Sequence, residues 1–401
     1  MTAMLLSSLS FPPSRGAGLH RLSEFVPLAG APYAAGRNTD YGPDQPATVS
    51  RLSPYLRYRL ITEEETVRAV LQHHSYEAAE KFIQEVLWRT YWKGWLAMRP
   101  EVWQRYQREY DVLKEKYRDD PAIRAAEQGT TGIEGFDDWA KELVQTGYLH
   151  NHARMWFASI WIFTLKLPWV LGAAFFLRHL LDADAASNTL SWRWVAGLQT
   201  PGKTYLATTE NIARFTNGRF FPKGLALSAE AHVESPLAAP KTLSTLKPLE
   251  SDAQSILLLH ADDLHPELIP LKKENVRAVF FVNDRYLFWG DKAHEFIAAS
   301  YDDLKNRVAY QYDLPLISLS TGNTNQLIEY AKSKAIKQIV TPYAPEGLAS
   351  NWLHSFETEL STAGLALVQY RRIWDEIFWP YATKGFFSFK EKVPSILREL
   401  V

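Results

Sequence analysis

The sequence predicts an all-helical domain over residues 48–225, followed by a parallel α/β domain over residues 254–401. Three observations support this prediction. In the first region, apolar residues recur at the spacing of amphipathic helices, and no segment is a clear strand. Residues 226–253 are small and polar and contain prolines, which is typical of a linker. Beyond them, short apolar runs alternate with helical stretches, as in proteins with a parallel sheet.

The helical region follows residues 1–47, which are rich in Pro, Gly, Ala and Ser and are expected to be an irregular lead-in. Thr62 and Glu65 have the spacing of a capping box, which predicts a helix start. An apolar stripe through Ala79, Phe82 and Val86 predicts a helix over residues 77–96. Further helices are expected near residues 101–127, 136–146, 150–165, 169–181 and 207–215.

The α/β region contains five apolar runs, and each predicts a strand. They lie at residues 256–259, 278–282, 314–319, 338–341 and 365–370. No internal repeat relates the two regions, so we expect domains of different class.

The composition excludes several classes of protein. The 44 Lys and Arg residues balance 45 Asp and Glu residues, which excludes binding of polyanions through overall charge. Because the chain has no cysteine, disulfides, thiolate catalysis, cysteine-ligated zinc and cysteine-held iron–sulfur clusters are excluded. The apolar stretch 155–177 is interrupted by Lys166 and Pro168, so neither half reaches the roughly 20 residues that a bilayer requires. We therefore expect no membrane association, and no convincing secretory signal opposes a cytoplasmic location.

Tryptophan is dense, with 14 residues, ten of them between Trp88 and Trp194. This density predicts a large core, although flat ligands and electron transfer also use indoles. One helix face carries two of them at spacings of i, i+3, i+4 and i+7, through Glu85, Trp88, Arg89 and Trp92. This face forms either an ion pair on a core helix or the lining of a pocket for a flat base.

Two other segments contain polar groups that require partners. Ser53 is predicted to cap a helix that begins at Pro54, and such a helix start suits a phosphate, although a plain cap has the same sequence. Arg154 precedes a strongly apolar run, and Asp182 is its most economical partner. Asp182 and Asp184 alternate in a loop, but no cluster of His or Glu completes a ligand set, so we expect no metal.

Together these segments resemble the FAD-binding helical domain of the DNA photolyase and cryptochrome family. The similar segments are VSRLSPYL at 49–56, EVLWRTYW at 85–92, GYLHNHARM at 147–155 and DADAASNTLSWRW at 182–194. The sequence departs from the family pattern at Val49 for Thr, Ala183 for Gly, His152 for Arg and Lys141 for Arg, and over residues 202–221.

The resemblance implies a role for each matched position. FAD would be bound by Tyr33, Ser50, Arg51, Leu52, Ser53, Arg89, Trp92, Arg154, Asp182, Asp184 and Asn188. The pocket for damaged DNA would be formed by Glu85, Trp88, Asn151, Met155 and Trp194. Electrons would reach the flavin through Trp192 and Trp169, with Tyr117 where the family has an outer Trp, and with Trp103 and Trp161 as alternatives. DNA would contact His152, Arg193 and Lys203, with Arg57, Arg59 and Lys93 as further candidates.

The chemistry of these side chains suits that assignment. A flipped pyrimidine dimer offers flat faces on which indoles stack, and carbonyl edges to which amides and carboxylic acids donate. An apolar pocket is expected to raise the pKa of Glu85, so that its protonated form donates a hydrogen bond.

The second region resembles the antenna domain that precedes the helical domain in most family members. The similar segments are residues 255–260, 278–283, 314–319 and 385–390. The resemblance implies a Rossmann-like fold and a circular permutation that places this domain after the helical one. No set of residues identifies a second chromophore, so this domain is either an antenna or a structural cover.

Two functions follow from the resemblance. The first is blue-light-driven repair of cyclobutane pyrimidine dimers in DNA by a monomeric photolyase, through electron transfer from reduced, photoexcited FAD. The alternative is a cryptochrome-like photoreceptor that binds FAD and repairs nothing. The five residues of the lesion pocket favour repair, and six-four photolyases carry His where Asn151 and Met155 stand. A light-independent flavin oxidoreductase would require a nicotinamide site, and no GxGxxG motif is present.

Overall fold

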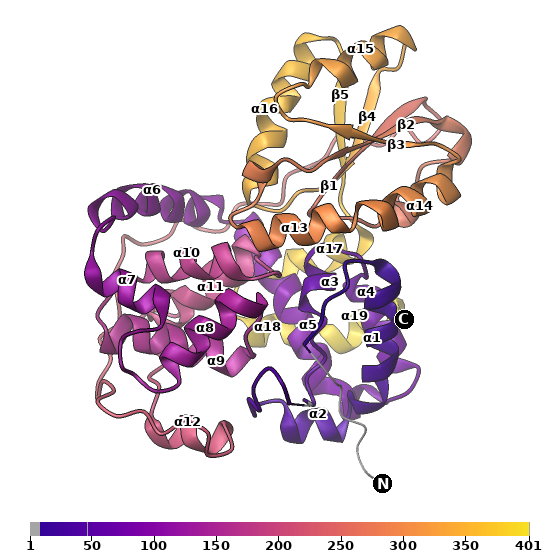
Figure 1. Ribbon diagram of the computed structural model, residues 1–401. Coiled ribbons are helices and arrows are strands. Elements are labelled where there is room, and N and C mark those ends of the chain that lie inside the picture. The colour runs from indigo at the N-terminus through magenta and orange to yellow at the C-terminus, as the bar shows by residue number, and fades with distance from the viewer. Residues whose placement is uncertain (1–8, 46, 401) are drawn as a thin grey trace.

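The computed structural model describes residues 9–45 and 47–400 and consists of a helical body and a five-stranded sheet (Figure 1). Helices before the sheet are α1 (Arg15–Phe25), α2 (Ala31–Gly36), α3 (Ser53–Arg57), α4 (Glu63–Leu71), α5 (Tyr76–Ala97), α6 (Pro100–Lys116), α7 (Pro121–Gln128), α8 (Phe136–Thr146), α9 (Asn151–Ser159), α10 (Trp169–His179), α11 (Ala185–Val195) and α12 (Thr209–Phe215). A π-helical segment, Ile160–Thr164, continues α9. The predicted class, an all-helical region followed by parallel α/β, is confirmed.

The expectation that residues 1–47 are irregular is wrong for residues 15–36, which contain α1 and α2, and residues 1–8 and 46 lie outside the described part of the chain. Ser14 caps α1 by accepting a hydrogen bond from the Ala17 amide at 3.1 Å. Phe25 and Tyr33 then pack against Phe82 of α5 with ring centroids 4.6 and 5.4 Å apart. The many small residues concealed these helices, whose stability comes from a few buried aromatic contacts.

The other predicted helices are present with changed ends. The capping box of α4 is confirmed, since the Glu65 amide donates to Thr62 Oγ1 at 3.1 Å and the Thr62 amide donates to Glu65 Oε2 at 2.8 Å. The helix expected over residues 101–127 is two helices, because Asp120 and Pro121 start α7 anew. Helix α11 lies outside the predicted helical ranges.

Residues 216–254 contain no helix or strand, in agreement with the predicted linker, yet they follow the surface of the helical body closely. The His232 amide donates to Ala196 O at 2.9 Å, and the Lys241 amide donates to Met98 O at 2.9 Å. The segment is therefore fixed to α11 and α5 at defined points.

The five predicted strands are confirmed as β1 (Ser255–His260), β2 (Val276–Val282), β3 (Leu316–Leu319), β4 (Gln338–Pro342) and β5 (Ala366–Tyr370). All neighbours are parallel, in the order β3-β2-β1-β4-β5. Helices α13 (Asp291–Ala299) and α14 (Tyr301–Tyr312) cover the face toward the helical body, and α15 (Asn325–Ser333) and α16 (Leu348–Thr362) cover the other (Figure 1).

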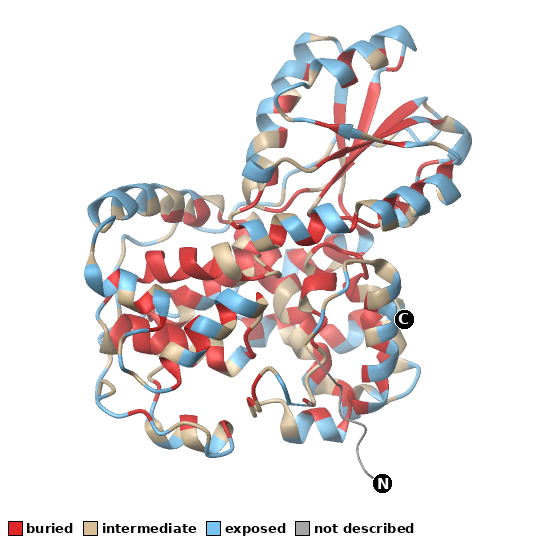
Figure 2. Cartoon of the chain, in the orientation of Figure 1, coloured by how far each residue is buried: buried red, intermediate tan, exposed pale blue. Residues whose placement is uncertain are grey.

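The two faces of the sheet belong to different cores. Leu257 and Leu259 of β1 join the large apolar cluster that also fills the helical body, whereas Ile256 and Leu258 pack with α15 and α16. Figure 2 shows the inner strands β1 and β4 buried along their length, whereas the edge strands β3 and β5 are partly exposed. The sheet is thus packed directly onto the helical body.

The last helices of the chain leave the sheet and return to the helical body. They are α17 (Ile373–Phe378), α18 (Phe386–Lys390) and α19 (Val393–Leu400), and α17 and α18 pack on α5. Trp374 Nε1 donates to Thr90 Oγ1 at 3.0 Å, and Tyr91 Oη donates to Lys384 O at 2.7 Å. The prediction that residues 254–401 form one α/β domain therefore needs correction, because the sheet ends at Tyr370 and the rest packs against the helical body.

No helix within residues 9–45 and 47–400 is long and apolar enough to cross a membrane.

Candidate functional site

Two buried carboxylates in front of α11 form the centre of the site. Asp182 and Asp184 have side chains 3% and 5% exposed. Arg154 of α9 reaches Asp182 Oδ2 at 3.1 Å, and Arg89 of α5 reaches Asp184 Oδ2 at 3.3 Å. The pairing of Arg154 with Asp182 that the sequence predicts is confirmed. Helices α5 and α9 and the loop before α11 thus bring their charged side chains to one place.

The ionisation of these carboxylates follows from their neighbours. Burial opposes it, but Lys93, Arg57 and Arg89 outweigh burial and lower the pKa of Asp184 to about 2. Burial likewise opposes ionisation of Asp182, and Arg154 and Arg89 still lower its pKa. Both groups are therefore charged at neutral pH. Asp184 also caps α11, since its Oδ1 accepts from the Ser187 amide at 2.7 Å.

The predicted cap of α3 is wrong. Ser53 is the first residue of the helix rather than its cap, and Leu52 occupies the cap position without a side-chain hydrogen bond. The Ser53 Oγ is buried and has no hydrogen-bond partner among the described residues. The loop before α3 is held by Ser50, whose Oγ accepts from the Leu52 amide at 3.4 Å.

Several buried polar atoms of the described residues have no protein partner. In the carboxylate cluster these are Lys93 Nζ, Asp182 Oδ1 and Ser187 Oγ, and in the loop before α3 they are Arg51 Nε and Nη1. An unpartnered polar atom costs about 1–3 kcal/mol when buried. A ligand with phosphates and a polar ring edge would satisfy these donors and this acceptor, so the residues fit FAD.

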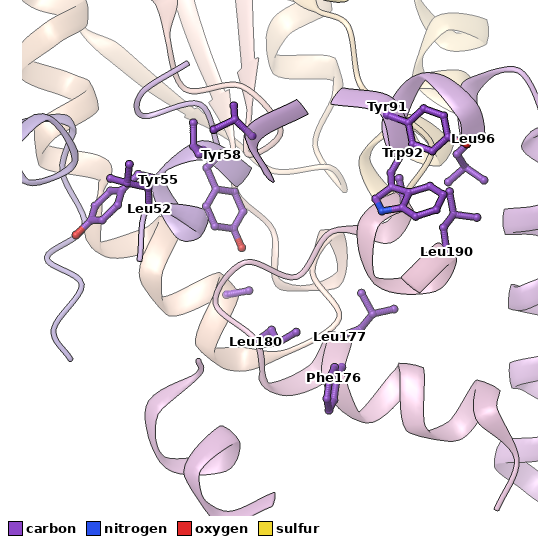
Figure 3. Close-up of a cluster of buried hydrophobic side chains, with 14 of the residues drawn as sticks. Leu52, Tyr55, Tyr58, Tyr91, Trp92, Leu96, Phe176, Leu177, Leu180 and Leu190 are labelled. Atoms are coloured by element: carbon purple, nitrogen blue, oxygen red, sulfur yellow. The ribbon is translucent and has the colours of Figure 1, made fainter. Parts of the chain in front are cut away.

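The remaining predicted FAD contacts are buried around this cluster. Asn188 of α11 donates through Nδ2 to Ala173 O at 2.9 Å, so its Oδ1 is left for another partner. Trp92 of α5 lies beside Leu190 of α11 (Figure 3). Tyr33 belongs to α2 and packs on Phe82 of α5, and burial raises the pKa of its phenol.

The predicted lesion-pocket residues lie on three helices that pack together. Helix α11 contacts α5, which carries Glu85 and Trp88, and it also contacts α9, which carries Asn151 and Met155. Trp194 of α11 is half-buried and stacks on Tyr205 with centroids 5.6 Å apart. Asn151 is exposed, and Met155 is half-buried.

Glu85 has the expected electrostatic character. Burial raises the pKa of its carboxyl, and the guanidinium of Arg37 opposes this rise. Arg37 Nη1 lies 2.5 Å from Glu85 Oε1. Sequence reasoning missed Arg37, although it stands one helical turn after the assigned Tyr33.

The predicted electron donors lie in a run of aromatic rings. Trp192 is 2% exposed, and its ring fits against Gly172, where a Cβ would lie 2.3 Å from it. Gly172 is one helical turn from Trp169 on α10, and the Trp169 ring lies 5.9 Å from Tyr106 of α6. Tyr106 in turn stacks on Trp103 at 5.2 Å and lies 5.9 Å from Trp289. The ring contact of Tyr117 is with the Lys116 ammonium at 5.3 Å.

The predicted DNA-contacting cations need correction. Arg193 is 2% exposed and forms an ion pair with Glu234 of the linker. Burial lowers the pKa of His152 to about 4, so its imidazole is neutral at pH 7. Among the further candidates, Lys93 is buried, and Arg57 and Arg59 form ion pairs with Asp262 and Asp375. Lys203 is the predicted contact that is exposed.

A small cavity lies where α3 meets the carboxyl ends of β1 and β4. Its volume is about 40 Å³, and Arg57, Asp262, Trp289 and Gly347 are among its lining residues. Arg57 Nη1 lies 2.5 Å from Asp262 Oδ1 across it. A cavity of this size holds about one or two water molecules rather than a chromophore.

Comparison with known proteins agrees with this site. Residues 82–220 match the FAD binding domain of DNA photolyase. A deoxyribodipyrimidine photo-lyase of Streptomyces griseus is 35% identical over 153 residues, which cover 38% of this chain and 32% of the relative. One from Vibrio cholerae is 28% identical over 214 residues, which cover 50% of this chain and 45% of the relative. The chain thus spans 32% to 45% of the length of these two curated relatives.

Among solved structures, a class III photolyase from Agrobacterium tumefaciens is 26% identical, with a TM-score of 0.42 and coverage of 50% of this chain and 44% of that one. A Synechocystis cryptochrome is 24% identical, with a TM-score of 0.43 and coverage of 53% and 45%. The match over residues 82–220, together with the curated relatives, shows that this helical part of the chain is an FAD-binding domain of the DNA photolyase family.

Proposed function

We propose that the chain is a flavin-dependent photolyase that repairs cyclobutane pyrimidine dimers in DNA. The observation that carries this proposal is Glu85, a carboxyl whose pKa is raised by burial, on the same face of α5 as Trp88 and Arg89. A protonated Glu85 would donate a hydrogen bond to a base, and Trp88 would provide a stacking surface beside a residue of the carboxylate cluster. FAD, when bound, supplies the light-driven electron that splits the dimer.

The carboxylate cluster would hold the flavin. Arg89 and Arg154 fix the two carboxylates, and these in turn offer acceptors to the polar edge of the ring. Asn188 would direct its free Oδ1 toward the flavin, because its amide nitrogen is already bonded to Ala173. The unpartnered nitrogens of Arg51, with Ser50 and Ser53, would bind the diphosphate.

The lesion pocket would hold the dimer by stacking and by hydrogen bonds. Glu85 accepts from Arg37 through Oε1, so Oε2 is the oxygen that would donate to a dimer carbonyl when the carboxyl is protonated. Trp88 and Trp194 would provide flat faces, and the exposed amide of Asn151 would add a donor.

Electrons would reach the flavin through Trp192 and Trp169. Beyond Trp169, the ring contacts favour Tyr106 and its neighbours Trp103 and Trp289 over the predicted outer donor Tyr117. The indole is the most easily oxidised side chain, so Trp103 and Trp289 are better end points of this path than Tyr106.

The test is repair of an oligonucleotide with a thymine dimer under blue light, measured by recovery of thymine ultraviolet absorbance against a dark control. Glu85→Gln should keep more activity than Glu85→Ala, because the amide still donates a hydrogen bond. Trp88→Ala should weaken binding about tenfold to a hundredfold, since stacking contributes roughly 1–3 kcal/mol per base. A wild-type protein that contains FAD and repairs no dimer in single- or double-stranded DNA would contradict the proposal.

A photoreceptor without repair activity is the second candidate, and the buried cations favour it. Arg193 is paired with Glu234, and His152 is neutral at pH 7, so two predicted DNA contacts offer no free charge. DNA binding would then lack the salt dependence that several phosphate contacts produce. Light-driven flavin reduction without dimer repair would identify this function.

For the sheet we propose the role of an antenna-like domain, placed after the helical domain by circular permutation. The parallel sheet, its order and its position against the helical body support this proposal. An absorption spectrum of the purified protein tests the antenna: a near-ultraviolet band beyond those of flavin would support a second chromophore, and a pure flavin spectrum would support a structural cover.

A further inference from the structure

The far end of the chain contacts the proposed lesion pocket. Phe386, the first residue of α18, stacks on Trp88 with ring centroids 3.6 Å apart and planes inclined by 11°. Figure 1 shows α18 close to α5, although nearly 300 residues separate them in sequence. No local pattern in the sequence predicts this contact.

The Phe386 ring is held in place by its surroundings. It is 5% exposed and contacts Phe389 and Tyr91, with centroids 5.8 and 5.5 Å away. Tyr91 also anchors the preceding loop through its hydrogen bond to Lys384 O. The ring therefore has little freedom to turn away from Trp88.

Phe386 is also the parallel neighbour of Trp88. The other described rings against this indole are Trp92, inclined by 35°, and Tyr91, inclined by 83°. A parallel ring fixes the plane of an indole more closely than tilted or edge contacts, because its overlap is lost when the indole rotates. With one face of Trp88 covered, a base can stack only on the opposite face.

We propose that Phe386 is a positioning residue for substrate binding, which orients the Trp88 indole so that its opposite face accepts a base of a flipped dimer. This inference rests on the proposed function. It makes a residue of the C-terminal segment a determinant of lesion recognition, although residues 82–220 alone match the FAD-binding domain.

The test measures binding in the dark, so that it does not depend on repair. The ratio of the dissociation constants for an undamaged oligonucleotide and for the same oligonucleotide with one thymine dimer is measured by fluorescence anisotropy. Phe386→Leu keeps an apolar side chain without a ring and should lower this ratio about threefold to tenfold, which corresponds to the loss of one aromatic pair. Phe386→Tyr keeps an aromatic ring and should leave this ratio at its wild-type value.

Phe387→Leu is the matched control, because Phe387 is the next residue and is 79% exposed. It should bind like the wild type. If Phe386→Leu lowers the melting temperature but leaves the ratio unchanged, Phe386 has only a structural role and the inference is wrong. If the wild type itself does not prefer the damaged oligonucleotide, the proposed repair function fails first, and this inference fails with it.

Discussion

Asp184 provides the most direct test of the carboxylate cluster, because two of its contributions can be separated. Its side chain is 5% exposed, caps α11 and pairs with Arg89 at 3.3 Å and with Arg57 at 3.7 Å. The pKa of Asp184 falls from its ordinary value of 3.8 to about 2. At 1.36 kcal/mol for each pKa unit, the charge contributes roughly 2 kcal/mol to folding at pH 7. The cap contributes about 1 kcal/mol more.

The two contributions predict different losses for two substitutions. Asp184→Asn removes the charge but keeps an oxygen that caps the helix, so the free energy of unfolding should fall by about 2 kcal/mol. Asp184→Ala removes both and should cost about 3 kcal/mol. Asp119→Asn is the control, because that side chain is 87% exposed, and a surface ion pair such as its contact with Arg124 contributes little.

The dependence on pH has a defined sign. A carboxyl with a lowered pKa stabilises the fold above its unfolded pKa, and this stability is lost as the pH falls through its folded pKa. The difference between wild type and Asp184→Asn in urea denaturation should therefore be constant from pH 7 to pH 5 and shrink between about pH 4 and about pH 2. Equal stability of the two proteins at pH 7, or a difference that changes between pH 5 and pH 7, would refute this reasoning.

Three further predictions follow from other parts of the structure. Gly172→Ala should lower the free energy of unfolding by about 1–3 kcal/mol, measured by thermal denaturation, because the new Cβ would lie 2.3 Å from Trp192. Gly16→Ala is the control and should not lower it, because the nearest atom to its new Cβ is 4.0 Å away. Equal losses for the two variants would contradict the packing of Trp192 on Gly172. Burial and Asp40 raise the pKa of Glu142 to about 8, so the stability of the wild type should decrease as the pH rises from about 5 toward 8. The urea midpoint of Glu142→Gln should equal that of the wild type at pH 5 and exceed it at pH 9. A constant difference between the two midpoints would show that Glu142 does not titrate in this range. Trp192→Phe should abolish light-driven reduction of bound flavin, followed by absorption, and Tyr106→Phe should slow it more than Tyr117→Phe; the reverse order would favour the path through Tyr117.

Much of the architecture could be predicted because its signals are local. The capping box at Thr62, the apolar runs of the strands and the change of pattern after residue 253 all depend on neighbouring residues. Helices α1 and α2 were not predicted because the segment around them is rich in Pro, Gly, Ala and Ser, and because their stabilising aromatic contacts are with Phe82, far away in the sequence. The assignment of residues 371–400 to the α/β domain was wrong for a similar reason: nothing in the sequence near Trp374 or Phe386 shows that their partners are on α5.

The candidate site likewise contains some contacts that the sequence predicts and others that it does not. The pairing of Arg154 with Asp182 could be predicted, since a cation before an apolar run needs a partner and few carboxylates were available. The ion pair of Arg193 could not be predicted, because its partner Glu234 lies in a segment without regular structure. For His152, the decisive factor is burial against Trp156 and Phe215, which removes the charge that a DNA contact would require.

The buried charges also show how the two regions depend on each other. Arg59 follows α3 and donates to both oxygens of Asp375 in α17, at 2.8 and 2.6 Å, and Arg372 donates to both oxygens of Asp263 after β1, at 2.6 Å each. Arg59 also lies 3.4 Å from Asp263, so the two pairs form one network across the predicted domain boundary. Replacing either residue of a pair by a neutral one would leave a buried charge without its partner, which costs about 3–5 kcal/mol for each broken pair. The change after residue 253 therefore marks where the hydrophobic pattern of the sequence changes. Residues on both sides of this position contribute jointly to the free energy of folding, through this network and through the common apolar core.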